Sequence, residues 1–335
     1  MRAARPILAV SIDTEEDDWD RYEAEGATTA NIAHLTELHE RMAALGARPT
    51  YLVNRPPLLE AESVEVLGAL AERPEVEIGA HCHPWNTPPV TATGWAHSMM
   101  CTLPTEVNRA KIAEVTDRIE TELGVRPTTF RAGRWAFGPT VAKALVAEGY
   151  RVDASVTPFV DWTPEGGPDF LEAPFRPYRC HPDEPLEPAD DGALVEIPTT
   201  VGYLRGHPRR MARFRRSLER SVLARLKVVG ILGTAGVIQR RWLSPEHSTA
   251  KDMIALCAAC LRHGAPVLDL TFHSCTLLPG ATPFVRDPRD RERFVASIEE
   301  VLRYAERSGF AFATLGEAGA TLATLPGPKP SGQSA

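Results

Sequence analysis

Two histidines stand two residues apart at the end of an apolar stretch with the alternation of a β-strand. His81 and His83 close the segment VEIGAHCHPW, over 76–85. Residues two apart in a strand point to the same face, so both imidazoles should face one way. Two imidazoles held by one strand supply half of a tetrahedral metal site. An isolated pair of this kind also fits two polar residues that merely leave a strand, so the rest of the chain must decide.

Acidic residues follow an earlier predicted strand, over 7–12. The segment SIDTEEDDW places Asp13 at the strand end and Glu15 on the same face. Acids at such a position can complete a metal site or act as a general base. The acids that follow them are more typical of a solvated loop: Asp17, Asp18 and Asp20.

Two later segments also end predicted strands with polar side chains. Arg131 in FRAGR could neutralise and orient a carboxylate, although it could equally form a surface ion pair. His273 in LDLTFHS ends an apolar strand and would therefore face the mouth of a barrel. Catalytic groups of parallel α/β barrels stand where the strands end.

The elements that must position these residues alternate along the chain. Short apolar segments predict strands over 7–12, 50–53, 76–83, 128–131, 151–155, 194–198, 267–273 and 310–314. Helical periodicity lies between them, for example in the stripe Ile112, Val115, Ile119 and Leu123. Seven or eight such units favour an α/β barrel.

Composition bounds the function. With 335 residues, 43% hydrophobic and 24% charged, the chain can bury a large core and is not a disordered or fibrous protein. A net charge of −7 argues against a general nucleic-acid binder. The charge is uneven, because residues 203–243 carry eleven of the 37 Lys and Arg residues and one acid. The remainder therefore has 26 basic and 43 acidic residues, a net charge of −17.

Two segments interrupt the alternation. Residues 158–188 contain eight prolines and predict a long irregular loop, a candidate lid over the barrel. Residues 203–243 keep helical spacing and then enter an eleven-residue apolar run over 228–238, which is too short to span a membrane. We expect a basic helical insertion that either contacts an anionic membrane or packs on the barrel or a second subunit. Residues 1–325 should form one domain, with a disordered tail over 326–335.

Taken in order, the segments SIDTEED, HCHPW, FRAGRW and LTFHS resemble the polysaccharide deacetylases, the NodB-homology family also called carbohydrate esterase family 4. The resemblance implies a distorted (β/α)7 TIM-like barrel and a metal-assisted amide hydrolase acting on N-acetylated sugars. The strings HCHPWNTPP, DASVTPF, GPDF and EIPTT look like a divergent branch associated with bacterial exopolysaccharide or lipopolysaccharide synthesis.

The resemblance also implies roles. Asp13 would take the proton from the attacking water, Arg131 would keep Asp13 ionised, and His273 would protonate the departing amine. A divalent metal on His81, His83 and Glu15, taken as zinc with cobalt or nickel as alternatives, would polarise the amide carbonyl. Either Asp153 or Asp161 would orient His273.

Two departures from the family pattern leave assignments open. One residue separates the two histidines, where the family has three, and Thr14 stands in place of the usual second aspartate. We favour Glu15 as the third ligand because it shares a face with Asp13, with Asp17 as the first alternative and Asp13 itself as the other. Side chains near the motifs could bind a sugar, although tryptophan packs in protein cores more often: Trp85, Arg134, Trp135 and Trp162.

The sequence thus predicts a metal-dependent deacetylase of an N-acetylated sugar in a cell-surface polysaccharide or glycan precursor. The alternatives are a related hydrolase of a small amide or ureide, and a catalytically silent carbohydrate-binding barrel. Because Asp13 follows the first apolar stretch at once and the six cysteines suggest reduced thiols, we expect a cytoplasmic protein, peripheral to the inner membrane face if 203–243 binds lipid. The oligomeric state is left open.

Overall fold

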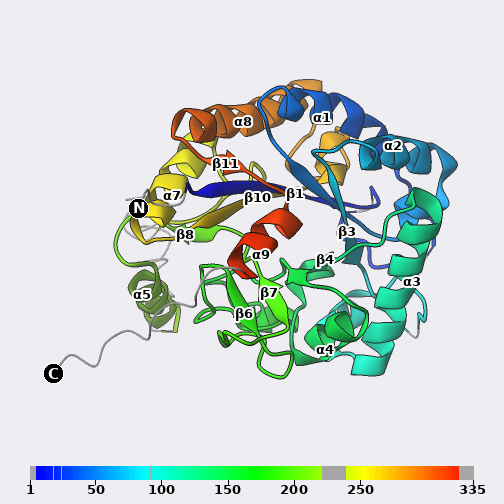
Figure 1. The fold of residues 1–335 in the computed structure, drawn as a ribbon, viewed down its shortest axis with the longest axis horizontal. Coiled ribbons are helices and arrows are strands. Elements are labelled where there is room, and N and C mark those ends of the chain that lie inside the picture. The colour runs from blue at the N-terminus through cyan, green and yellow to red at the C-terminus, as the bar shows by residue number, and fades with distance from the viewer. Residues whose placement is uncertain (1–4, 18, 24, 91, 221–238, 324–335) are drawn as a thin grey trace.

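Seven parallel strands curl into a barrel wall in the computed structural model, which describes residues 5–17, 19–23, 25–90, 92–220 and 239–323 (Figure 1). Their order is β10-β1-β2-β3-β4-β5-β7. They are β1 (Ile7–Thr14), β2 (Pro49–Val53), β3 (Glu77–Cys82), β4 (Thr129–Ala132), β5 (Val152–Asp153), β7 (Leu194–Glu196) and β10 (Val267–His273). The expected distorted (β/α)7 architecture is confirmed.

Helices cover the outside of this wall (Figure 1). They are α1 (Leu35–Ala43), α2 (Ala61–Ala71), α3 (Thr105–Leu123), α4 (Pro139–Ala147), α7 (Ala250–Arg262) and α8 (Pro288–Arg307). On α3 the predicted stripe is correct, since Ile112, Val115 and Ile119 are fully buried. The start of α8 is set locally, because the side chain of Asp287 accepts a hydrogen bond from the backbone of Asp290.

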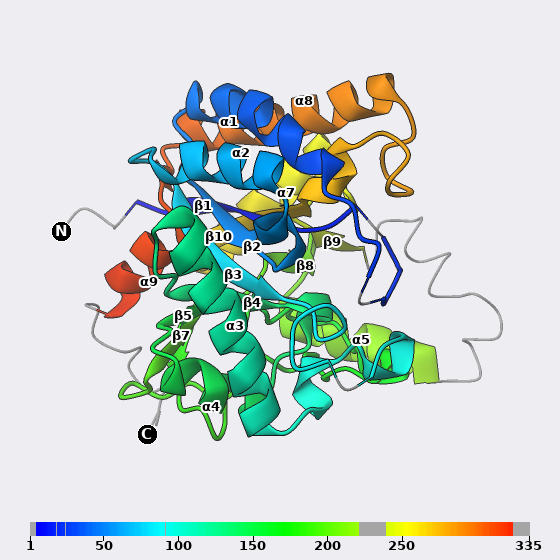
Figure 2. The same ribbon diagram turned by 90° about the vertical axis from the view of Figure 1, so that its right-hand side faces the viewer.

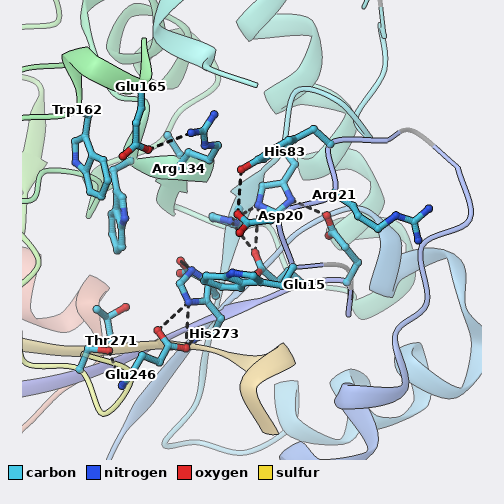
Figure 3. Close-up of a pocket in the computed structure, with 18 of the residues that line it drawn as sticks. Glu15, Asp20, Arg21, His83, Arg134, Trp162, Glu165, Glu246, Thr271 and His273 are labelled. Atoms are coloured by element: carbon cyan, nitrogen blue, oxygen red, sulfur yellow. Dashed lines mark hydrogen bonds and ion pairs between the residues drawn. The ribbon is translucent and has the colours of Figure 1, made fainter. Parts of the chain in front are cut away.

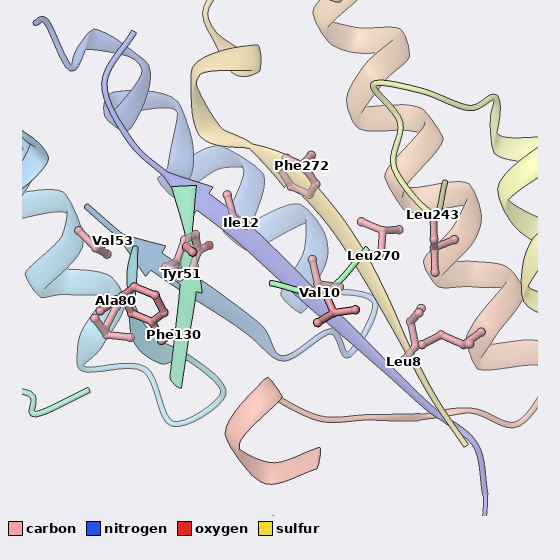
Figure 4. Packing of buried hydrophobic residues seen from close by; sticks show 14 of the residues in the cluster. Leu8, Val10, Ile12, Tyr51, Val53, Ala80, Phe130, Leu243, Leu270 and Phe272 are labelled. Atoms are coloured by element: carbon pink, nitrogen blue, oxygen red, sulfur yellow. The ribbon is translucent and has the colours of Figure 1, made fainter. Parts of the chain in front are cut away.

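Strand alternation sorts each strand's side chains between the helices and the barrel lumen. On β1, Leu8, Val10 and Ile12 join the core beneath the helices (Figure 4), whereas Ser11 and Asp13 point into the lumen, where both contact Arg131. The amino end of the lumen is closed by α9 (Leu315–Ala323), through the apolar contacts of Leu315 and Ala318 and through Glu77, which accepts hydrogen bonds from Thr50, Thr129 and the Gly316 amide. The residues expected to do chemistry lie toward the opposite end, where the strands have their carboxyl ends.

The wall is split between β7 and β10. A separate antiparallel pair of strands, β8 (Val201–Tyr203) and β9 (Arg240–Trp242), lies at this split. Just after β9, Leu243 donates to the carbonyl of Thr200 and accepts from the amide of Thr271 on β10. The basic segment enters between β8 and β9 as α5 (Pro208–Arg220), so the helical prediction is correct for that part. Residues 221–238 and the expected tail over 326–335 lie outside the described residues.

The proline-rich segment 158–188 is largely irregular, as expected, but it contains one short strand that the sequence did not predict. That strand, β6 (Tyr178–Cys180), pairs antiparallel with β7 at the edge of the sheet. Proline flanks it on both sides, at Pro177 and Pro182, which an edge strand tolerates. The last strand, β11 (Ala311–Phe312), pairs with β1.

A buried lysine fixes the segment that follows β3. The Lys111 ammonium donates to the backbone carbonyls of Pro84, Thr87 and Pro89 at 2.6–2.8 Å, and its side chain is 1% exposed. Three charge-assisted hydrogen bonds to one loop hold it against α3. Because this loop begins at His83, the lysine also limits where that imidazole can lie.

Replacing this lysine should therefore destabilise the protein. Lys111→Met leaves three carbonyls without their donor, and we expect the free energy of unfolding to fall by about 3 kcal/mol in urea titrations. Lys143→Met is the control, because Lys143 lies on α4 with a side chain that is 44% exposed. Equal losses in both variants would contradict the role assigned to Lys111.

Candidate active site

A pocket of about 230 Å³ opens at the carboxyl ends of the strands (Figure 3). Its walls come from the segments that follow β1, β3, β4, β5 and β9, and from the end of β10. Five of the six tryptophans in the chain line it, namely Trp19, Trp85, Trp135, Trp162 and Trp242. The residues expected to do chemistry and the residues expected to bind a sugar therefore share one pocket, apart from Arg131, which lies buried beneath it.

Glu15, His81 and His83 converge in this pocket. Their ligand atoms lie within 4.8 Å of one another, and all three residues are buried. The two imidazole Nε2 atoms are 2.9 Å apart, and Glu15 Oε2 lies 3.4 Å from His81 Nε2 and 3.2 Å from His83 Nε2. Thus the three side chains that the sequence grouped as metal ligands form a cluster.

Outer hydrogen bonds aim both imidazoles into the cluster. His81 Nδ1 donates to the backbone carbonyl of Arg131 at 2.9 Å, which leaves the lone pair on Nε2. His83 Nδ1 lies 2.9 Å from Glu16 Oε1, and Asn54 and Asn86 donate to that carboxylate. Burial alone would lower the pKa of His83, but Glu16 and Glu15 outweigh it and raise the pKa to about 10.

The donor set fits a divalent metal. Bonds of about 2.1 Å at tetrahedral angles place neighbouring ligand atoms roughly 3.4 Å apart, close to the 2.9–3.4 Å found between the three residues. Asp17 does not take part, because its carboxylate accepts hydrogen bonds from Thr28, Ala30 and Asn31 and ties the loop after β1. The alternative third ligand is therefore wrong in this structure, and Glu15 is the acid at the cluster.

Arg131 lies fully buried beneath the pocket. Its guanidinium donates to Asp13 Oδ1 at 2.7 Å and to Asp269 Oδ2 at 2.8 Å, and also to Ser11 and Thr271. Burial would raise the pKa of Asp13, but Arg131 and the nearby histidines outweigh it, and the pKa lies below its ordinary value. The Arg131 guanidinium thus favours the ionised form of Asp13, the role expected for this arginine.

His273 stands beside Asp13 on the neighbouring strand. The register pairs Asp13 with His273, and His273 Nε2 lies 3.6 Å from Asp13 Oδ2. On its other side, Nδ1 lies 3.0 Å from Glu246 Oε2 (Figure 3). The other oxygen of that carboxylate, Oε1, accepts hydrogen bonds from the His273 amide and from Thr276. Burial lowers the pKa of His273, but Glu246, Glu15 and Asp13 raise it to about 10.

Glu246 replaces both aspartates that were expected to orient His273. Asp153 points to the outer face of β5, because Val152 and Ala154 on either side of it face the lumen, and its carboxylate accepts from Ser155. Asp161 lies in the loop after β5 and accepts from Thr163. The expectation that one of these two aspartates orients His273 is therefore wrong, and the carboxylate beside His273 comes from the segment after β9.

The four candidate sugar-binding residues line the pocket in different ways. Trp85 is buried and stacks on the His83 imidazole, with ring centroids 4.1 Å apart. Trp135 and Trp162 gather around Trp242, at 5.9 and 6.4 Å. Arg134 and Trp135 both adopt positive φ, at 54° and 58°, which side chains other than glycine rarely do. Such strain is often kept where it places functional side chains.

Sequence reasoning missed several pocket residues. Glu16 lies beyond the end of β1, where alternation no longer predicts a direction, and Glu246 and His247 lie in an irregular segment. Asp20, Arg21 and Tyr22 also line the pocket, although the loop they belong to was expected to face solvent.

Solved structures of other proteins have a similar fold over nearly the whole of this chain. A proposed polysaccharide deacetylase from Mycobacterium smegmatis is similar over 98% of this chain and 97% of its own, with a TM-score of 0.53 and 17% identity. A glycoside hydrolase family 57 branching enzyme from Thermococcus kodakaraensis covers 97% of this chain and 72% of its own, with a TM-score of 0.52 and 11% identity. No known family model and no curated protein sequence matches the chain.

The resemblance to polysaccharide deacetylases is thereby confirmed at the level of the fold. Two proteins of different description share that fold with this chain, so the chemistry has to be argued from the pocket.

One glycine allows the segment after β4 to approach the cluster of candidate metal ligands closely. A Cβ on Gly133 would overlap the His83 ring and lie 2.8 Å from the Cys82 carbonyl. Gly133→Ala should therefore displace His83 and weaken zinc binding about tenfold or more, as measured by competition with a chromophoric chelator. Gly138→Ala is the control, because its Cβ would meet only an ordinary contact with Cys101 at 3.5 Å. Unchanged affinity in Gly133→Ala would contradict His83 as a ligand.

The Glu246 contact should be visible in the titration of His273. In Glu246→Gln the neighbouring negative charge is lost, so the pKa of His273 should fall from about 10 toward its ordinary value. Imidazole resonances followed by NMR over a pH series would measure this change. Glu165→Gln, which alters a carboxylate at the pocket rim, should leave it in place. A pKa that stays high in Glu246→Gln would show that another group holds His273.

Proposed function

We propose that this protein is a metal-dependent hydrolase that removes the acetyl group from an N-acetylated amino sugar of a cell-surface polysaccharide or its precursor. The observation that carries the proposal is the cluster of Glu15, His81 and His83 beside Asp13 and His273, in one pocket lined by tryptophans. Aromatic rings stack on the apolar faces of sugar rings, which favours a sugar over a small ureide as substrate.

Glu15, His81 and His83 would hold the metal, for which zinc suits two imidazoles and a carboxylate, as cobalt and nickel also would. When bound there, a divalent ion supplies Lewis-acid chemistry, because it polarises an amide carbonyl and lowers the pKa of water. Four acids with buried side chains line this pocket, namely Asp13, Glu15, Glu16 and Glu246. Their negative charge favours a bound cation.

Asp13 and His273 would share the proton transfers. Asp13, ionised by its contact with Arg131, takes a proton from the attacking water. His273, whose pKa of about 10 keeps it protonated at neutral pH, donates its Nε2 proton to the leaving amine. An amide nitrogen leaves poorly unless it is protonated, so the reaction requires this second group.

The aromatic wall would bind the sugar. Trp135 and Trp162 both lie beside Trp242 along the pocket, and the Arg134–Glu165 ion pair stands at its rim. The Trp85 ring would position the His83 imidazole on which it stacks. We also propose that the protein works in the cytoplasm, which the six free cysteines support. Among the described residues, no helix is long and apolar enough to cross a membrane.

Substitutions should separate metal binding from proton transfer. His81→Ala and Glu15→Gln should lower metal content and activity together, because each removes one of three ligands. Asp13→Asn and His273→Ala should keep the metal and lower turnover by about 10² to 10⁴-fold. The measurements are metal content by mass spectrometry and acetate release from a panel of N-acetyl sugars, with and without chelator.

His181→Ala is the matched control, because His181 is exposed and pairs with Asp191 away from the pocket. It should retain both metal and activity. A wild-type protein that takes up no zinc, cobalt or nickel and releases no acetate would overturn the proposal and favour a silent carbohydrate-binding barrel. Turnover of a small ureide without acetate release would keep the hydrolase and reject the sugar.

A further inference from the structure

The basic helix α5 packs one face on the loop that builds a wall of the pocket. Ala212 is buried against Phe159 and Tyr203, with Met211 packed beside them. Two ion pairs fix the helix further, from Arg213 to Glu172 and from Arg216 to Asp169. Phe159 and these two acids belong to the proline-rich segment, which also supplies Trp162 to the pocket. The orientation of α5 relative to the pocket is therefore set by specific contacts.

The other face of α5 is exposed and combines positive charge with an aromatic ring. Phe214 is 47% exposed, one of the few large apolar side chains so open to solvent in the described residues. Arg209 and Arg210 are exposed on the preceding turn, and Arg205 is exposed just before the helix. Within the described residues, the ion pairs of α5 are made by Arg213, Arg215 and Arg216. The charges of Arg205, Arg209 and Arg210 are not used in ion pairs of that part of the chain and stay available.

Helix α5 lies on the same side of the barrel as the pocket. Figure 2 shows α5 on the right, where β1 and β3 end, and α9 on the left, at the amino ends of the strands. The pocket is lined by the segments that follow those strands. A partner bound to α5 would therefore lie near the end of the barrel that holds the pocket.

We propose that the exposed face of α5, formed by Arg209, Arg210 and Phe214 with Arg205 beside it, docks on an anionic lipid bilayer. The charge pattern carries the choice of partner. Residues 203–243 hold eleven basic residues and one acid, whereas the rest of the chain has a net charge of −17. An anionic surface attracts the first and repels the second, so a single orientation is favoured, with α5 toward the lipid.

Phe214 adds a contribution that charge alone does not give. An aromatic side chain flanked by arginines is the pattern with which helices lie in the interface of a bilayer, the ring among the upper acyl chains and the guanidinium groups at the phosphates. Docking of this kind goes beyond the proposed hydrolysis, because it requires no activity. It would bring the pocket to sugars carried on lipids.

Co-sedimentation with vesicles tests the proposal. The full chain should bind vesicles that contain phosphatidylglycerol, release them as salt rises, and bind phosphatidylcholine vesicles far more weakly. Removing two charges in Arg209→Gln/Arg210→Gln should lower partitioning roughly 30-fold, since each basic residue near an anionic surface contributes about fivefold. Phe214→Ser should lower it about fivefold at low and at high salt alike.

A double variant on α8, Arg289→Gln/Arg307→Gln, is the matched control. Both arginines are exposed, and the change in net charge is the same. We expect partitioning within twofold of wild type, with all variants folded by circular dichroism. Equal losses in the control would show that net charge, not α5, drives binding and would overturn the proposal. Equal binding to neutral vesicles, no binding at all, or wild-type binding by Arg209→Gln/Arg210→Gln would overturn it as well.

Discussion

The guanidinium of Arg131 is the contact on which the architecture of the site depends. From β4 it crosses the lumen to Asp13 on β1 and Asp269 on β10, and its Nε donates to the Ala154 carbonyl after β5. Four strands are thus joined by one fully buried side chain. Removing one partner of such a buried cluster typically costs about 3–5 kcal/mol, because a charge is left without compensation. The same bonds that hold the barrel therefore set the position and the charge of Asp13.

A consequence of this arrangement is an excess of negative charge at the mouth of the lumen. One guanidinium faces two carboxylates, and burial raises the pKa of Asp269 to about 6 even though Arg131 lowers it. Nearer the pocket, the carboxylates of Glu15 and Glu16 lie beside the imidazole of His83. The Nε2 atoms of His81 and His83 are 2.9 Å apart. Two lone pairs at that distance repel unless a cation lies between or beside them. A proton on His83 satisfies this in part, and a divalent ion suits the number of acids better.

Alternation along strands predicted what the strands themselves fix. It put His81 and His83 on one face and Glu15 on the face of Asp13, while the order of the motifs suggested that these groups share one site. The register of β1 with β10 brings Asp13 and His273 together. It could not assign Glu246, because nothing periodic ties an irregular segment after β9 to the end of β10. Asp153 shows the opposite failure: a residue of suitable type, one position after a strand residue that faces the lumen, points to the outside. Position in a motif order suggested a role that the face of the strand excludes.

The split in the barrel explains why the irregular part of the chain matters so much for the site. Because β7 and β10 do not pair, the segment after β9 can insert its backbone between them, through Leu243 and its bonds to Thr200 and Thr271. That insertion delivers Trp242 to the pocket and Glu246 to His273. The strand paired with β9, which is β8, leads into α5. The part of the chain between β7 and β10 thus supplies the acid beside His273, one tryptophan of the pocket wall and the basic helix α5.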